Sequence, residues 1–87
     1  MNYEIIWHED TIEDLRKFPL KESKRIISKI EQYLSENPIQ LGKSLRGKLK
    51  GLYRYRIGRY RVIYQINQSE CKIIVIRVGK RDEIYGS

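Results

Sequence analysis

Arginine alternates with tyrosine or an apolar residue along residues 51–66, which read GLYRYRIGRYRVIYQI. A guanidinium group can hold two oxygens of a phosphate at once, so a row of arginines suits the binding of a phosphate or a similar anion. Without such a ligand the like charges repel one another and lower stability. The pattern therefore predicts an anion site, and it fits both an enzyme and a simple binding protein.

The same alternation indicates on which face each side chain lies, because successive side chains of a β-strand point to opposite faces. In the expected strands 52–57 and 60–67, tyrosine and aliphatic side chains share one face, which we expect to pack on helices. Lys48 and Lys50 in the preceding segment would add positive charge near the other face. That other face carries three arginines, Arg54, Arg56 and Arg61.

The net charge of +7 is unevenly distributed along the 87 residues. Residues 1–42 carry six basic and eight acidic side chains, whereas residues 43–87 carry twelve basic and three acidic ones. This imbalance indicates an anionic partner for the C-terminal half, with nucleic acid as the first candidate. A basic surface without any such partner is the alternative.

Hydrophobic periodicity and turn residues predict the order of the secondary structure elements. The order predicts an α+β fold (β-α-α-β-β-β), in which two N-terminal helices pack on one face of a small, mostly antiparallel sheet. We expect a single domain over residues 1–87, with the last strand inside the sheet and the first strand paired to one of the others. The expected elements are strand 2–7, helices 8–18 and 20–37, a loop over 38–51, and strands 52–57, 60–67 and 71–78.

Several classes of protein are disfavoured by composition. No apolar run approaches the roughly 20 residues of a membrane span, and the N-terminus does not resemble a signal peptide, so we expect a cytoplasmic protein that does not contact a membrane. His8 and Cys71 are the single histidine and cysteine, and they cannot form a structural zinc site. We therefore expect neither a metal nor a small-molecule cofactor.

The stretches LYRYRIGRYRVIYQI and IIVIRVGKRDEIY, with the preceding strand and helices, resemble the RelE/ParE superfamily of bacterial and archaeal toxins. The chain is more similar to the RelE branch, which implies a type II toxin that cuts mRNA in the ribosomal A site without a metal. It also implies a cognate antitoxin, of which we expect an acidic segment to bind along helix 20–37. A ParE-like inhibitor of DNA gyrase and a non-catalytic RNA-binding module are the alternatives.

The resemblance assigns roles to individual residues. Arg54 and Arg56 correspond to two basic residues that position the RNA strand and stabilise developing charge. Arg61 and Arg81 correspond to arginines that would hold the scissile phosphate and offset charge on its oxygens. Tyr85 corresponds to a C-terminal tyrosine that would stack on a base or donate a proton.

The sequence departs from the family pattern at two of these positions. The best-studied RelE-type sites have lysines where Arg54 and Arg56 stand, and one of those lysines is commonly assigned as the general base. Arginine does not deprotonate in proteins, so Arg56 is a poor base. His8 lies near the end of the first strand, whereas Lys48 and Lys50 precede the arginine-bearing strands and are the candidate substitutes.

Overall fold

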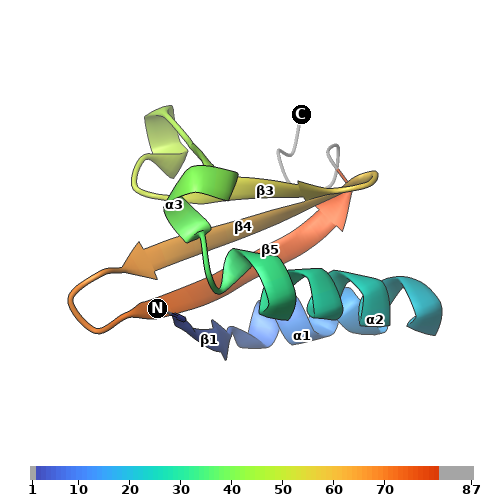
Figure 1. The fold of residues 1–87 in the computed structure, drawn as a ribbon. Coiled ribbons are helices and arrows are strands. Elements are labelled where there is room, and N and C mark those ends of the chain that lie inside the picture. The colour runs from blue at the N-terminus through green and yellow to red at the C-terminus, as the bar shows by residue number, and fades with distance from the viewer. Residues whose placement is uncertain (1, 81–87) are drawn as a thin grey trace.

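A five-stranded sheet forms the centre of the computed structural model, which describes residues 2–80 (Figure 1). The spatial order of the strands is β1-β5-β4-β3-β2, and β1 runs parallel to β5 while all other pairs are antiparallel. The α+β class and the position of β5 inside the sheet are therefore confirmed. The strands are β1 (Glu4–Trp7), β2 (Lys43–Ser44), β3 (Tyr53–Ile57), β4 (Tyr60–Asn67) and β5 (Lys72–Lys80).

Helices cover one side of this sheet (Figure 1). The first begins where Nδ1 of His8 accepts a hydrogen bond of 3.1 Å from the backbone N–H of Asp10, which satisfies a donor at the helix start. The helix predicted over 20–37 ends at Leu34, and its last turn is π-helical. No helix in the described part is long and apolar enough to cross a membrane. The helical segments are α1 (Glu9–Arg16), α2 (Leu20–Lys29) and the π-helical η1 (Ile30–Leu34).

The hydrophobic core lies between α2 with η1 and the tyrosine-bearing face of the sheet. Three fully buried side chains come from α2 and η1, namely Ile26, Ile30 and Leu34. Tyr64 is also fully buried, and its hydroxyl donates a hydrogen bond of 2.6 Å to the carbonyl of Pro38. Burial raises the pKa of Tyr64 well above its usual value, so the hydroxyl keeps the proton that it donates. The predicted packing of the tyrosine face on the helices is confirmed.

Helix α1 covers the part of β5 that β1 leaves unpaired. Thr11 donates through Oγ1 to the carbonyl of Val75 at 2.7 Å, and the Asp14 carboxylate accepts the N–H of Val78 at 2.9 Å. Asp14 also accepts from Nε of Arg77 at 2.9 Å and from its Nη2 at 3.1 Å. These side chains give hydrogen-bond partners to backbone groups of β5. Because Arg77 is held by the same Asp14 carboxylate, it has a structural role in this fold.

The segment predicted as a loop over 38–51 contains short ordered elements. They are α3 (Pro38–Leu41), the strand β2 and a 3₁₀ turn, η2 (Gly47–Leu49). Gly42 lies against the Tyr64 hydroxyl so closely that a β-carbon there would overlap it, which ties the start of β2 to the core. β2 pairs with β3, with Lys43 opposite Arg54 and Ser44 opposite Tyr53. A strand of two residues has no periodicity that sequence reading could detect.

Candidate nucleic-acid interface

The hairpin between β3 and β4 brings the arginines together. Gly58 has a φ of +59°, a conformation that glycine adopts without strain, and with Arg59 it forms the two-residue turn that the sequence predicts. This turn places Arg56 directly opposite Arg61, and Arg54 is opposite a residue further along β4. Opposing residues of an antiparallel pair share a face, so the expected arginine face is confirmed.

The short strand β2 and the residues after it complete a pocket of about 470 Å³ on this face. Lys43 is the register partner of Arg54 and therefore points to the same face. The pocket combines one serine and one leucine with five basic side chains, which makes it suited to a phosphodiester. Its lining residues are Lys43, Ser44, Leu45, Arg46, Arg54, Arg56 and Arg61.

Arg54 of this pocket has a buried hydrogen-bond donor that is not satisfied by any described residue. Its side chain is partly buried, and its Nε is a buried donor without a hydrogen-bond partner within residues 2–80. Such a donor typically costs about 1–3 kcal/mol when it stays unsatisfied. None of the ion pairs found within the described residues includes Arg54 or Arg56. An anion in the pocket would offset the charge of this guanidinium, and a small shift of the side chain would let its Nε donate to an anion oxygen.

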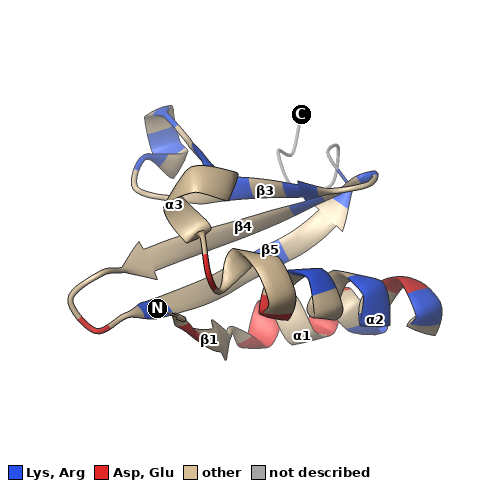
Figure 2. Ribbon diagram, viewed as in Figure 1, with Lys and Arg blue, Asp and Glu red and all other residues tan. Residues whose placement is uncertain are grey.

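Charge is also segregated at the scale of the whole fold. Figure 2 shows basic segments along β3, around η2 and on α2, whereas acidic segments mark α1 on the far side of the sheet. The carboxylates of α1 are therefore remote from the arginine face and do not neutralise it. A polyanion would be drawn to the β2–β4 side of the molecule.

The structure separates the other residues that the sequence suggested. Lys48 lies in η2 and Lys50 directly follows it, and both are exposed and outside the lining of the pocket. His8 caps α1 and does not reach the pocket. Arg81 and Tyr85 lie outside the described residues, so their predicted roles stay predictions.

Two basic residues of the pocket were missed by the sequence-based prediction. Lys43 and Arg46 belong to the stretch that was read as a loop, and only the pairing of β2 with β3 reveals that Lys43 faces Arg54. The available signal was the density of basic residues between positions 43 and 50. That signal indicated Lys48 and Lys50 equally well, so it could not select among them.

Residues 5–85 match the family model described as the ParE toxin of the type II toxin–antitoxin system parDE. The chain belongs to this toxin family. Toxin RelG of Mycobacterium tuberculosis is 32% identical over 89 residues, covering 98% of each chain. Toxin RelE of the same organism is 35% identical over 72 residues, covering 83% of this chain and 74% of the relative.

The fold of the toxin is also similar to solved structures. A crystal structure of the toxin–antitoxin complex RelBE2 from Mycobacterium tuberculosis contains a chain with a TM-score of 0.89 and 28% identity. The match covers 93% of this chain and 100% of that chain. Together with the RelE and RelG relatives, this match confirms the predicted membership of the RelE/ParE toxin superfamily.

Proposed function

We propose that this toxin is a ribosome-dependent mRNA endonuclease that acts in the cytoplasm and inhibits translation. The observation that carries the proposal is the basic pocket between β2, β3 and β4, whose lining includes Arg54 with its buried, unsatisfied Nε. An unsatisfied buried donor and several like charges close together lower the folding stability, which is small for a protein of this size. A bound polyanion would offset this loss.

The arrangement supports cleavage by the 2′-hydroxyl group of the mRNA. In this reaction the 2′-oxygen attacks the adjacent phosphorus, and negative charge develops on the phosphate oxygens. Arg56 and Arg61 face each other across the hairpin and would hold those oxygens from two strands. Arg54 would bind the same phosphate through its guanidinium group, because its side chain lines the pocket. Arg81 and Tyr85 would add a further phosphate contact and a contact to a base.

The ribosome supplies what the pocket lacks in this proposal. Most of the described lining groups are cationic and recognise a phosphate, and Lys43, Arg46 and Arg56 are exposed to solvent. A guanidinium holds a phosphate but does not by itself align the 2′-oxygen for attack in line with the leaving oxygen. An mRNA already held in the decoding site would arrive in a restricted conformation, so cleavage of free RNA should be slow.

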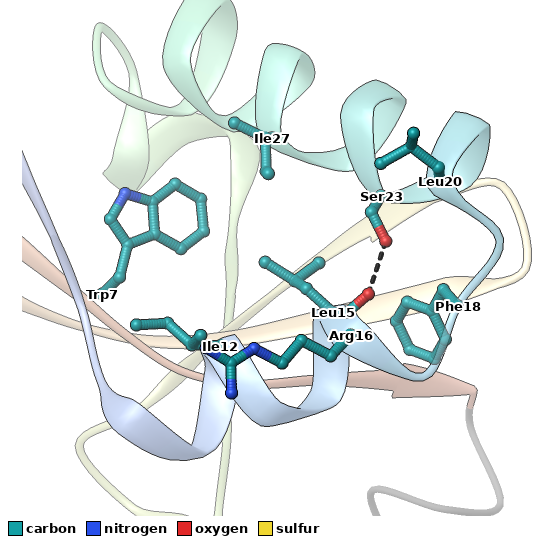
Figure 3. A pocket seen from close by; sticks show the side chains of 8 residues that line it. All are labelled: Trp7, Ile12, Leu15, Arg16, Phe18, Leu20, Ser23 and Ile27. Atoms are coloured by element: carbon teal, nitrogen blue, oxygen red, sulfur yellow. Dashed lines mark hydrogen bonds between the residues drawn. The ribbon is translucent and has the colours of Figure 1, made fainter.

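A second surface suits the antitoxin that we propose as the partner. A groove of about 520 Å³ runs between α1 and α2, and Figure 3 shows aliphatic and aromatic side chains pointing into it from both helices and from β1. The hydroxyl of Ser23 donates to the carbonyl of Leu15 at 2.6 Å and holds the two helices together. The groove is lined by Trp7, Ile12, Leu15, Arg16, Phe18, Leu20, Ser23 and Ile27.

Charge on the flank of the groove indicates what would bind there. Lys21 and Lys24 are exposed on α2 and directly follow the lining residues Leu20 and Ser23, and Leu20 is 70% exposed. An amphipathic helix with acidic residues on one flank would bury the apolar side chains and pair with these cations. The similar chain of known structure is part of a toxin–antitoxin complex. We therefore infer that an acidic helix of a cognate antitoxin occupies this groove.

The test of the enzyme proposal compares two activities of the same purified toxin. On ribosomes with an empty A site, a defined mRNA should be cut within the A-site codon. DNA supercoiling by gyrase should be unaffected. Arg54→Gln should lose most of this cleavage, whereas the control Arg59→Gln at the hairpin tip, outside the pocket lining, should not. Inhibition of gyrase, or tight ribosome binding without a cut, would contradict the proposal.

A further inference from the structure

The proposed cleavage needs a group that moves a proton, and most of the described pocket cannot supply one. When the 2′-oxygen attacks, the 5′-oxygen leaves and must gain a proton. The arginines hold charge but do not release protons in the accessible pH range, and the single hydroxyl is that of Ser44. Lys43 is the one lysine that lines the pocket among the described residues.

The backbone around Lys43 fixes the position of this lysine. Lys43 is in register with Arg54, so the two side chains emerge from the same face of neighbouring strands. Gly42 packs against the hydroxyl of Tyr64, and that hydroxyl is bonded to the carbonyl of Pro38. The start of β2 is therefore anchored to the core on one side and to β3 on the other.

Other described groups that could transfer a proton are engaged elsewhere. His8 accepts a hydrogen bond at the start of α1, and Tyr64 donates to the carbonyl of Pro38 inside the core. Lys48 and Lys50 are on or beside η2 and do not line the pocket. Lys43, by contrast, is exposed at the pocket and takes part in none of the ion pairs within residues 2–80.

We propose that Lys43 is the general acid of the cleavage reaction, an inference that rests on the proposed endonuclease function. The bond between the 2′-oxygen and phosphorus forms while the bond between phosphorus and the 5′-oxygen breaks. The ammonium group of Lys43 gives one proton to the departing 5′-oxygen and becomes a neutral amine, which regains a proton from solvent. The proton of the 2′-hydroxyl passes to water. The products are a cyclic phosphate and a free 5′-hydroxyl.

This assignment explains how the site can lack lysine at both arginine positions of β3. In the proposed site Arg54 and Arg56 bind the phosphate, and the proton donor stands on the neighbouring strand β2. A lysine on β2 and a lysine on β3 project from the same face of the sheet because they are cross-strand neighbours. Lys43 then supplies the proton for the leaving 5′-oxygen, and water accepts the proton of the 2′-hydroxyl, so neither arginine position of β3 has to carry a lysine that acts as a base.

The experiment uses ribosomes programmed with two versions of one mRNA. In the first version the scissile linkage has its normal 5′-oxygen, and in the second a sulfur atom replaces that oxygen. A thiolate leaves without protonation because thiols are far more acidic than alcohols. The toxins compared are wild type, Lys43→Arg and Lys43→Ala, with Lys17→Arg as the matched control, since Lys17 is exposed at the end of α1 and outside the pocket lining.

Lys43→Arg keeps the positive charge but cannot donate a proton, so it separates the two possible roles of the lysine. On the oxygen-containing mRNA we expect Lys43→Arg to lose about 10²-fold or more in the rate of the cleavage step, as is typical when a general acid is removed. On the sulfur-containing mRNA we expect Lys43→Arg to cut at a rate close to wild type. Lys17→Arg should match wild type on both.

Two results would overturn the assignment, and both differ from a failure of the proposed function. If wild type and Lys43→Arg cut the oxygen-containing mRNA equally well, Lys43 supplies charge only. If the defect of Lys43→Arg persists on the sulfur-containing mRNA, the lysine positions the substrate and is not the proton donor. If wild type cuts neither mRNA, the endonuclease proposal itself fails, and the assignment fails with it.

Discussion

The arginine pocket and the groove between α1 and α2 have similar volumes, about 470 and 520 Å³, but opposite chemistry. The pocket concentrates cations and contains the unsatisfied Nε of Arg54, whereas the groove exposes apolar side chains such as Leu20. Each costs the isolated toxin stability in a different way, through charge repulsion in one case and exposed apolar surface in the other. This difference is why we propose two partners, a polyanion for the pocket and a protein helix for the groove.

The arginines of the sheet also differ from one another because, in the described part of the chain, one is held by a carboxylate and others are not. Arg77 forms two hydrogen bonds to the carboxylate of Asp14, which also holds the N–H of Val78. Arg54 and Arg56 have no ion-pair partner within the described residues. A paired arginine stabilises the fold, and an unpaired one is available to a ligand. Substitution should therefore affect stability at the first site and activity at the second.

The largest effect should come from the pocket. Arg61→Ala should lower A-site cleavage by about 10²–10³-fold, because it removes a donor to the charge that develops on the phosphate. Growth inhibition in cells should be lost in parallel, and Arg81→Ala should behave in the same way. Arg59→Ala is the matched control, since Arg59 lies at the hairpin tip outside the pocket lining. A folded Arg61→Ala protein that remains fully toxic would contradict the role of the pocket.

The next effect concerns the fold. Asp14→Ala should lower the free energy of unfolding by about 1.5–3 kcal/mol, the usual range for losing hydrogen bonds to a charged group. The change leaves the N–H of Val78 and the guanidinium of Arg77 without this acceptor. Denaturant unfolding measures the loss, and cleavage per folded molecule should be unchanged. Loss of cleavage with unchanged stability would show that the paired arginine is not merely structural.

A smaller effect is expected at the groove. Ile12→Asp should weaken antitoxin binding at least about tenfold, or ~1.4 kcal/mol, because it places a carboxylate among apolar side chains and opposite an acidic partner. Calorimetry with the antitoxin measures the affinity, and A-site cleavage should not change. Ile39→Asp is the matched control, since Ile12 and Ile39 are each 41% exposed and Ile39 lies on α3, away from the groove. If Ile12→Asp and Ile39→Asp weakened binding equally, the antitoxin site would not be this groove.

The smallest effect is a gain in stability. Arg56→Gln should stabilise the free toxin by about 0.2–1 kcal/mol at low salt, because it removes one of two like charges that face each other across the hairpin. The gain should shrink as salt screens the remaining charges. Unfolding midpoints in low and high salt measure it, with Arg59→Gln as the control. A loss of stability would mean that Arg56 does not lower the free energy of unfolding of the free toxin.

Sequence patterns predicted the parts of the molecule that have a regular period. Alternation in β3 and β4 was sufficient to place Arg54, Arg56 and Arg61 on one face and the tyrosines on the other, because the side-chain period of a strand is two. Gly58 indicated the hairpin because glycine adopts the positive φ that this turn requires. These features depend on neighbours in the chain, which is why a sequence read alone could reveal them.

Features that depend on distant residues were not predictable in the same way. The strand β2 is only two residues long, so the pairing of Lys43 with Arg54 exists only in the assembled sheet. The contacts of Asp14 with Arg77 and Val78 join positions 63 and 64 residues apart. The sequence-based prediction named Lys48 and Lys50, whereas the structure brings Lys43 to the pocket, and the roles of Lys48 and Lys50 stay predictions.

The most direct test of the arginine pocket as an RNA-cleaving site uses the 2′-hydroxyl itself. Ribosomes are programmed with an mRNA that carries either ribose or a single 2′-deoxyribose at the nucleotide before the scissile phosphate. Wild-type toxin should cut the ribose mRNA and leave the deoxyribose mRNA intact, and Arg61→Ala should cut neither at a comparable rate. Cleavage of the deoxyribose mRNA at the same position, or undiminished cleavage of the ribose mRNA by Arg61→Ala, would contradict the proposed site.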